Sequence, residues 1–354
     1  MRVGNGSIEL DATIAGILLL DGITNGAVYA LLAIAIVLVF AVTRVIFVPQ
    51  GEYVAFAALT VGYLQLGQVP GTVWLLLGFA ALAAAMDIVE AVRTRQRPAR
   101  VARRLAGVLV LPVVVSALTI WIAPQKPPLL VQMALTLALV TPMGPLLYRV
   151  AYQSLADASV LVLLIVSVGV HFALTGLGLV FFGAEGFRTP GLWETRFSAG
   201  GITLSGQTIV IFLATAALIV MLFVYFDRTL SGKALRATAV NRNGARLMGI
   251  STDGAGRLSF TMAAFIGALS GLLIGPSTTV FYDSGFLVGL KGFVAAVFAG
   301  LASFPAALAG ALIVGVIESF GSFWASAFKE VIVFTAILPV LLWRSLIDKH
   351  VEEH

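Results

Sequence analysis

Side chains capable of chemistry are sparse in this sequence, and several of them lie inside long apolar runs. Glu52, His171, Lys291 and Glu318 are the main examples. Within lipid, ionisable groups are costly, so they indicate solute contact, ion coupling or pairing between helices. The chain has no cysteine, three histidines, no Gly-x-x-x-x-Gly-Lys-Ser/Thr loop and no Gly-x-Ser-x-Gly motif. These features argue against a phosphate-loop ATPase, a metal enzyme and a serine hydrolase.

The composition indicates that these residues lie in a membrane protein. Of 354 residues, 60% are hydrophobic and 11% are charged, against about 25% charged residues in globular domains. The apolar runs have helical length, so we expect one all-α, polytopic transmembrane bundle over residues 1–354, with about 10–11 spans. The predicted spans are 13–43, 53–69, 72–92, 105–123, 129–148, 158–182, 207–227, 258–281, 287–303, 306–322 and 329–343. The segment 287–303 is short enough to be re-entrant.

The loops predict an orientation. Six arginines lie between residues 93 and 104, and residues 228–257 add five arginines and one lysine. Counting spans places both segments on one side, which the positive-inside rule makes cytoplasmic. We therefore expect a cytoplasmic C-terminus and an extracytoplasmic N-terminus whose first helix is retained. The net charge of +5 comes mostly from these loops and does not favour a nucleic acid partner.

The basic segment 232–251 predicts an amphipathic helix between two spans. Ala237, Val240, Gly244, Leu247 and Met248 share one stripe, and Arg236, Arg242, Asn243 and Arg246 lie opposite. Gly249 is a natural helix stop, and Ser251 to Asp253 offer capping oxygens for the next helix. From composition alone, such a helix either lies on the membrane with its apolar stripe against the protein, or docks a soluble partner.

Three stretches carry a family resemblance. They are "RATAVNRNGARLMGIS", "DGITNGAVYALLAIAIVLVF" and "GLKGFVAAVFAGLASFPAALAGALIVGVIES", in an order that covers about two-thirds of the chain. Together they resemble the permease subunits of ABC importers of the branched-chain amino-acid (Liv) type. The resemblance implies an ABC importer permease fold, no enzyme activity and no cofactor of its own. It also implies a bacterial or archaeal plasma membrane location.

The resemblance implies alternating access driven by partners. These would be two ABC ATPase subunits that bind ATP, a second permease or a copy of this chain, and an extracytoplasmic solute-binding protein. Coupling would run through residues 236–250, with a packed inner stripe and a polar contact face. The implied coupling residues are Arg236, Ala237, Asn241, Arg242, Gly244, Arg246 and Gly249.

The solute is left open by a departure from the family. The stretch "VIFVPQGEYVAF" has Phe47 and Gln50 where the family has Asn and His. The cargo is therefore a branched-chain amino acid or another small organic compound. The candidate translocation path consists of Tyr29, Gln50, Gly51, Glu52, Lys291 and Glu318.

The candidate path residues have alternative interpretations. Glu52 either lines the path or pairs at the interface with Arg44 or a helix N-terminus. Lys291 either extends to the interface, which we slightly prefer, or pairs with Glu318 or Glu52. A lone intramembrane histidine such as His171 is usually hydrogen-bonded to a neighbouring helix. In a secondary transporter or channel, the alternative function, the same charged residues would serve coupling or selectivity.

Two further segments stand out. Residues 72–128 have room for an extra helical hairpin compared with the family, which we interpret as an insertion anchored by its arginines on anionic lipid. The polar loop 183–205 is expected outside the cell. It either contacts the solute-binding protein or is an ordinary solvated loop.

Overall fold

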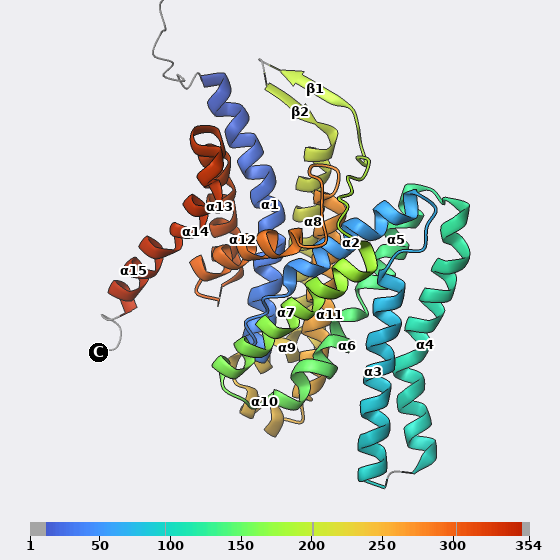
Figure 1. Ribbon diagram of the computed structural model, residues 1–354. Coiled ribbons are helices and arrows are strands. Elements are labelled where there is room, and N and C mark those ends of the chain that lie inside the picture. Colours follow the sequence, from blue (N-terminus) through green and yellow to red (C-terminus); the bar gives the residue numbers. More distant parts are fainter. Residues whose placement is uncertain (1–11, 96, 200–201, 302, 349–354) are drawn as a thin grey trace, which may run out of the picture.

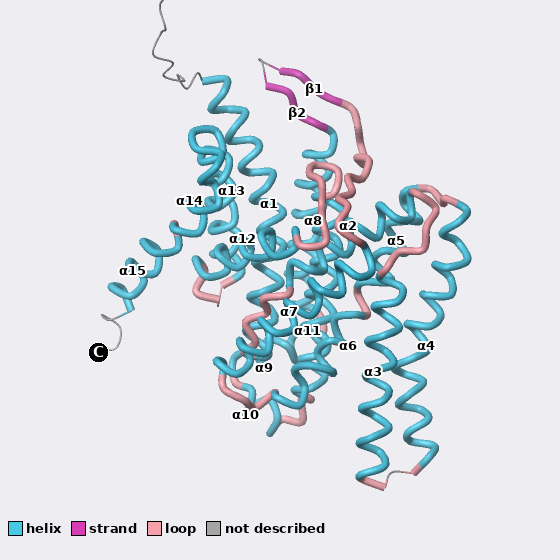
Figure 2. The backbone as a smooth tube through the Cα atoms, viewed as in Figure 1, coloured by secondary structure: helices cyan, strands magenta, loops and turns pink. Residues whose placement is uncertain are grey.

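The computed structural model describes residues 12–95, 97–199, 202–301 and 303–348 (Figure 1). The first half contains α1 (Ala12–Thr43), α2 (Gln50–Gln65), α3 (Thr72–Arg93), α4 (Pro98–Ile122), α5 (Leu129–Val140), α6 (Met143–Leu147) and α7 (Val160–Phe182). The second half contains α8 (Gly206–Arg228), α9 (Leu230–Val240), α10 (Arg242–Leu247), α11 (Thr252–Ile274), α12 (Ser284–Phe298), α13 (Phe304–Ala325), α14 (Lys329–Thr335) and α15 (Ile337–Asp348). A small hairpin of β1 (Arg196–Ala199) and β2 (Ile202–Ser205) is the one sheet in the described chain. The predicted all-α bundle is confirmed (Figure 2).

The number of helical segments that could cross a membrane differs from the ten or eleven predicted spans. Eight helical segments of the described chain are long and apolar enough to cross a membrane. The predicted spans 53–69 and 287–303 correspond to α2 and α12, which have 16 and 15 residues, fewer than the roughly 20 that a bilayer requires. The predicted spans 306–322 and 329–343 correspond to α13 and to α14 with α15. The backbone leaves the helical conformation at Ala325, so that Ile332 of α14 packs back on Gly321 of α13.

Short polar residues set many of the helix starts. Side chains of Ser159, Ser205 and Ser251 accept hydrogen bonds from backbone N–H groups in the first turns of α7, α8 and α11. Thr229 and Ser303 do the same for α9 and α13. These caps satisfy N–H groups that the first turn of a helix leaves without partners.

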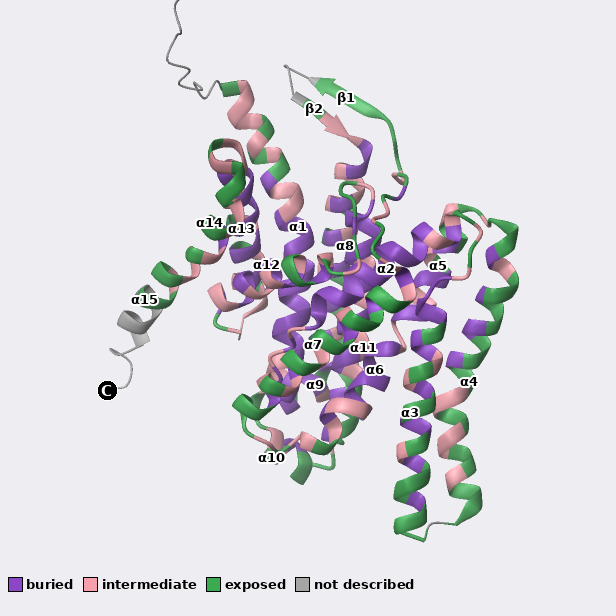
Figure 3. Ribbon diagram, viewed as in Figure 1, coloured by how far each residue is buried: buried purple, intermediate pink, exposed green. Residues whose placement is uncertain are grey.

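Helix α1 is central, and most of its length is buried (Figure 3). It packs against α13 through small residues. A Cβ on Gly22 would lie 2.7 Å from Val316 Cα, and one on Gly26 would lie 2.9 Å from Leu312 Cα. On the other side of the contact, Gly315 meets Gly22 and Gly26 backbone atoms. Helices in lipid associate through such close backbone packing, because the hydrophobic effect does not drive them together there.

Helices α2 and α12 run across the bundle (Figure 1). Gly51 of α2 meets the backbone of Gly285, and a Cβ on Gly289 would lie 2.9 Å from the Gly51 nitrogen. On α11, Gly267 contacts Gln50 and Tyr53, and Gly271 contacts the backbone of Val54. The small residues spaced along α11 therefore serve packing within the chain.

Helices α3 and α4 form a hairpin at the periphery, whose tip lies at the same end of the molecule as α9 and α10 (Figure 1). Arg104 pairs with Asp87 and Glu90 at 3.3 Å, and Arg149 also contacts both acids. Asp87 and Glu90 therefore attach Arg104 of the arginine-rich segment to α3, and the two basic segments lie at the same end of the molecule (Figure 1).

The β1–β2 hairpin lies at the opposite end from α10 (Figure 1). In the preceding loop, Phe187 pairs with Val280 through two backbone hydrogen bonds of 2.9 Å. Arg188 donates to the carbonyl of Pro276 at 2.9 Å. The loop 183–205 is therefore attached to the segment that follows α11. Residues 1–11 and 349–354, on which the predicted positions of the chain ends depend, lie outside the described residues.

Candidate functional site

A charged cluster in the interior joins α1, α12 and α13. The Lys291 ammonium donates to Glu318 Oε1 at 2.6 Å, and the Tyr29 hydroxyl donates to Glu318 Oε2 at 2.6 Å. The ammonium also lies 5.7 Å from the centre of the Tyr29 ring. Residue exposures of 5% for Lys291 and 7% for Glu318 mean that each charge depends on the other, because a lone charge in a dry interior is very costly.

The preferred interpretation of Lys291 as an interfacial residue is wrong. Its side chain turns inward because Glu318 and Tyr29 offer a charged and an aromatic partner that lipid does not. Three of the predicted path residues, Tyr29, Lys291 and Glu318, therefore lie in contact with one another.

Glu330 completes the cluster and was missed in the sequence. Its Oε1 lies 3.2 Å from the Lys291 ammonium, and it stands in the first turn of α14. The signal that could have found it is an acid at the start of the last apolar run. With Glu318, it gives the cluster two carboxylates for one ammonium.

The other predicted path residues form a second group at the start of α2. Gln50 donates from its amide to the carbonyl of Ala263 on α11 at 2.9 Å. Glu52 Oε1 lies 2.9 Å from His171 Nδ1 on α7. The suggested pairing of Glu52 with Arg44 is therefore wrong, and the prediction that His171 bonds to a neighbouring helix is confirmed. Gln50 and Glu52 are fully buried, so they line no open route in this conformation.

Helix α12 links the two groups. Its Gly285 and Gly289 touch Gly51 at the start of α2, and its Lys291 reaches Glu318 on α13. Five of the six predicted path residues thus lie on or against one short helix in the middle of the bundle, while Gln50 contacts α11.

A cavity of about 140 Å³, which we call the α12 cavity, lies beside the charged cluster. Its walls come from α2, the end of α11, the following loop, α12 and α14. Its lining includes Val54, Thr278, Ser284, Val288, Lys291 and Glu330. Since a water molecule occupies about 30 Å³ in the liquid, the cavity has room for a few waters or one small solute.

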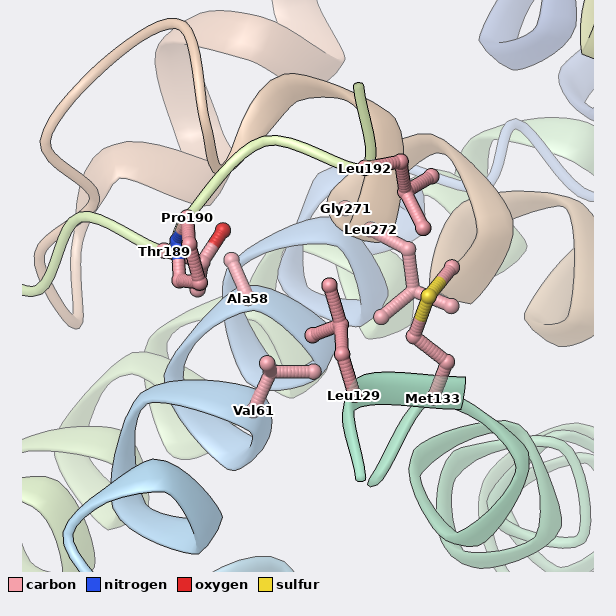
Figure 4. Close-up of a pocket in the computed structure, with 9 residues that line it drawn as sticks. All are labelled: Ala58, Val61, Leu129, Met133, Thr189, Pro190, Leu192, Gly271 and Leu272. Carbon is pink, nitrogen blue, oxygen red and sulfur yellow. The ribbon is translucent and has the colours of Figure 1, made fainter. Parts of the chain in front are cut away.

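A second cavity lies between α2, α5, α11 and the segment 189–192 (Figure 4). Figure 4 shows Val61 and Ala58 of α2 facing Leu129 and Met133 of α5 and Leu192. It encloses about 10 Å³, which is at the limit for a single water. No charged residue lines it, so of these two cavities only the α12 cavity combines charge with room for a solute.

The basic segment forms two helices instead of one. Asn241 has an extended backbone between α9 and α10, and its side chain accepts from the Gly244 N–H at 2.8 Å. The chain therefore restarts a helix at Arg242. Gly249, with φ of +79°, follows the end of α10, and Ser251 caps α11, as expected.

The predicted orientation of this segment is also wrong. Val240, Leu247 and Met248 of the apolar stripe are 81%, 88% and 82% exposed, and Ala237 is exposed too. The inner contacts come instead from Leu235, Thr238 and Ala245.

Arginines from the supposed outer face fix the segment to the bundle. Arg242 donates to the carbonyl of Ala156 at 2.7 Å, and Arg246 lies 3.1 Å from Asp157 and 3.0 Å from the Thr252 hydroxyl. Arg236 remains exposed. The helical pattern predicts the wrong orientation because the long arginine side chains reach back to backbone carbonyls and acids of the bundle. The apolar stripe has no apolar surface of the bundle to pack against on this side.

Metal binding finds no support in the described part of the chain, where no group of three or more His, Cys, Asp or Glu side chains could hold an ion.

Comparison with known proteins places this architecture in a family. The family described as "Branched-chain amino acid transport system / permease component" matches residues 18–342. The permease protein BraD of the high-affinity branched-chain amino acid transport system of Pseudomonas aeruginosa is 28% identical over 340 residues, which cover 92% of each chain. The corresponding LivH proteins of Salmonella typhimurium and Escherichia coli are 31% and 30% identical over 201 residues.

The LivH matches cover 55% of this chain and 65% of LivH. Among solved structures, PsaBC from Streptococcus pneumoniae in complex with Fab aligns over 92% of this chain and 90% of its own, with a TM-score of 0.37 and 11% identity. The family match, the eight apolar helical segments and the buried charges agree with one another. This chain belongs to the branched-chain amino acid transport system permease family, whose members are multi-pass membrane components of transport systems and not enzymes.

Proposed function

We propose that this chain is the permease subunit of an ATP-driven ABC importer and works by alternating access. ATPase subunits would drive it through residues 236–250. The observation that carries the proposal is the exposure of Val240, Leu247 and Met248 on a segment that is firmly attached to the bundle. Exposed apolar patches of this kind mark protein interfaces. The contact surface would therefore be apolar at its centre, with Arg236, Asn241 and Gly249 beside it.

The packing provides a path from this surface to the interior. Helix α11 starts at the Ser251 cap directly after α10. Its Gly267 and Gly271 contact α2 side chains and backbone, and α2 meets α12 at Gly51. Because close-packed backbones move as rigid bodies, a displacement of α10 would shift α11, α2 and α12 together. The Lys291 cluster lies at the end of this series.

The subunits and orientation of the importer follow from the same proposal. Two ABC ATPases would bind on the side of α9 and α10, which would be cytoplasmic together with the C-terminus. An extracytoplasmic solute-binding protein would contact the side of the loop 183–205. A second permease subunit, or a copy of this chain, would complete the path, in a bacterial or archaeal plasma membrane. The ATP would be bound and hydrolysed by the partner subunits.

The cargo proposed is a branched-chain amino acid or another small organic compound. The names of BraD and LivH as branched-chain amino acid permeases support the first class, and the change to Phe47 and Gln50 leaves room for the second. Both residues are buried in the structure, where Phe47 packs on Phe260 at a ring distance of 4.8 Å. Phe47 and Gln50, the two residues that differ from the family pattern, thus both contact α11.

We also propose that residues 72–128 are an insertion with a peripheral role. Val110, Val114 and Trp121 of α4 are more than half exposed, as expected of a helix that faces lipid. The tip between α3 and α4 carries arginines that would bind anionic headgroups, each contributing about 1 kcal/mol near the surface.

A self-sufficient secondary transporter remains the alternative, because the buried Glu52–His171 and Lys291–Glu318 pairs resemble coupling groups. It would transport solute in liposomes without any ATPase. The importer would need ATP and would ignore a proton or sodium gradient.

The experiment that tests the importer is a gentle-detergent purification of the tagged protein, with identification of every co-purifying chain. We expect an ATPase with a phosphate loop. Leu247→Glu should remove the ATPase, because it places a charge in the apolar contact surface. Val92→Glu, another largely exposed apolar position on the α3–α4 hairpin (73% exposed, against 88% for Leu247), should retain it. Recovery of the wild-type chain alone would favour the secondary transporter.

A further inference from the structure

Resting on the proposed import function and on the peripheral position of the α3–α4 hairpin, we propose that this hairpin regulates the basic segment in response to lipid. Its arginine-rich end, residues 93–104, which we call the hairpin tip, binds anionic lipid headgroups of the cytoplasmic leaflet. The bound headgroups restrain the hairpin, and a series of polar contacts extends this restraint to α10 and the start of α11. The insertion thereby acts on the proposed coupling element, beyond anchoring itself to the membrane.

The length of the hairpin places its tip at the headgroups. Trp74 and Trp121, both more than half exposed, lie near the ends of α3 and α4 that are opposite the tip. About 18 residues separate each tryptophan from the arginines on the same helix, or about 27 Å at the helical rise per residue. The hydrocarbon core of a bilayer is about 30 Å thick, and tryptophan is typical of the membrane interface. The tryptophans and the arginines therefore lie at opposite interfaces.

The tip presents uncompensated positive charge. Five of its arginines are exposed, and no ion pair is found for them in the described part of the chain: Arg93, Arg95, Arg97, Arg100 and Arg103. The neighbouring Val92 is apolar and 73% exposed, so the charge begins where the lipid-facing surface ends. Guanidinium groups donate paired hydrogen bonds to phosphate oxygens, and arginine clusters at this level bind anionic lipid. The fitting partner is a phosphate-bearing headgroup with a net negative charge.

The sixth arginine of the tip turns inward and connects the hairpin to the bundle. Arg104 lies 3.3 Å from both Asp87 and Glu90 of α3, and its side chain is 34% exposed. The same two acids contact the buried Arg149, which stands in the turn between α6 and α7. Two arginines and two carboxylates therefore form a cluster without net charge, and its geometry depends on the position of the hairpin.

One glutamine connects this cluster to α11. Gln153 Oε1 accepts a hydrogen bond from Arg149 at 3.1 Å and another from Arg257 at 3.3 Å. Gln153 Nε2 donates to Asp253 at 3.5 Å. Asp253 and Arg257 both lie near the start of α11. The position of Arg149, which the hairpin fixes, therefore affects the start of α11 through a single side chain.

The same connecting segment also holds α10. The carbonyl of Ala156 accepts a hydrogen bond from Arg242 at 2.7 Å, and Asp157 lies 3.1 Å from Arg246. Residues 148–157 thus contact the hairpin on one side and the basic segment on the other. Because binding that orders one side of such a unit lowers the entropic cost of ordering the other, headgroup binding at the tip stabilises α10 and the start of α11.

The experiment measures amide hydrogen exchange of the full-length permease in lipid nanodiscs, without any partner protein. One preparation contains phosphatidylcholine alone, and the other contains equal parts of phosphatidylcholine and phosphatidylglycerol. We expect exchange in residues 242–257 to be about fivefold slower with the anionic lipid, the lower end of ordinary coupling between two sites. Exchange in residues 183–195, at the opposite end of the molecule, should be equal in both. Soluble glycerol phosphate added to the phosphatidylcholine nanodiscs should have no effect.

Three variants separate headgroup binding from its transmission. The double variant Arg100→Gln, Arg103→Gln removes two charges from the tip and should abolish the lipid dependence. Gln153→Ala should still retain phosphatidylglycerol, counted by native mass spectrometry, but lose the protection of residues 252–257. Arg228→Gln removes an exposed arginine outside the hairpin, whose side chain is 82% exposed, and should respond to lipid like the wild type.

The proposal is overturned if exchange in residues 242–257 is equal in the two lipids, if the double arginine variant keeps the difference, or if Gln153→Ala keeps the protection of residues 252–257. Protection that appears only with an added acidic protein would also overturn it and would assign the tip to a protein partner. None of these outcomes affects the importer assignment, which depends on ATPase co-purification. Conversely, a lipid effect in a chain that recovers no ATPase would support the role of the hairpin and refute the importer.

Discussion

The Lys291 cluster and the α9–α10 segment reverse the arrangement expected in a water-soluble protein. The cluster buries Lys291 and Glu318 beside the half-buried Glu330, whereas the segment exposes Val240, Leu247 and Met248 almost fully. The buried charges have partners within this chain, and the exposed apolar side chains do not. The difference indicates that the cluster stabilises the fold of this chain, while the segment provides a surface for binding another protein. Mutations should therefore separate the two regions by stability and by assembly.

The largest effect on stability is expected from Lys291→Met. It leaves the buried Glu318 and the half-buried Glu330 without a cation, and breaking a buried pair such as Lys291–Glu318 costs about 3–5 kcal/mol. Thermal unfolding in micelles should show a strong decrease in midpoint. The control is Lys329→Met, which removes a lysine at the start of α14 for which no ion pair is found in the described structure. Equal stability of the two variants would contradict the interior role of the cluster.

A smaller loss is expected from Gly51→Val. Any Cβ at this position meets the carbonyl of Gly285, so α2 and α12 must separate, and overpacking of this kind costs about 1–3 kcal/mol. The measurement is again thermal unfolding, with uptake as a second readout. Gly78→Val on α3 is the matched control, because nothing lies within 4 Å of its Cβ position. A wild-type midpoint for Gly51→Val would show that the contact is not close.

Asn241→Ala should reduce the stability of the α9–α10 segment modestly and test whether this segment and the interior are stabilised independently. It removes the cap of α10, a loss of about 1 kcal/mol, and loosens the segment without touching the interior. Hydrogen exchange should increase in α10 and remain unchanged in α12. Increased exchange in both helices would mean that the cap stabilises more than the segment.

The smallest effect on stability is expected from Met248→Lys, within about 0.5 kcal/mol, because exposed positions tolerate substitution. Uptake and ATPase capture should nevertheless be lost, since a charge would enter the proposed contact. Arg236→Ala is a graded companion, expected to reduce ATPase capture less. A large decrease in unfolding midpoint for Met248→Lys would show that the side chain packs within the chain.

The sequence predicts the helical bundle well and the side-chain partners poorly. Apolar run length fixes where helices occur, and the motifs single out Tyr29, Lys291 and Glu318. Pairing between Tyr29 and Glu318 joins residues 289 positions apart, which no local pattern encodes. Hydropathy predicts spans at the short α2 and α12 because it does not distinguish a buried helix from one that faces lipid.

The basic segment illustrates a second limit. A helical wheel shows that Leu247 and Arg242 lie on opposite faces, but it does not show which face turns inward. That choice depends on Ala156 and Asp157, which lie between the fifth predicted span and α7 and supply polar partners for Arg242 and Arg246. The helical pattern does not reveal the break at Asn241, because the capping role of this residue depends on the backbone geometry around it.

The complete burial of the start of α2 has a consequence for the biogenesis of this protein. Gln50 is hydrogen-bonded to Ala263, 213 residues later, and Gly51 packs on Gly285. While a ribosome is still making the middle of the chain, neither partner exists, so Gln50 and Glu52 leave the translocon without their final neighbours. The second apolar segment therefore reaches its final place late, after synthesis of α11 and α12, and chains truncated before α11 should be preferred targets of membrane quality control.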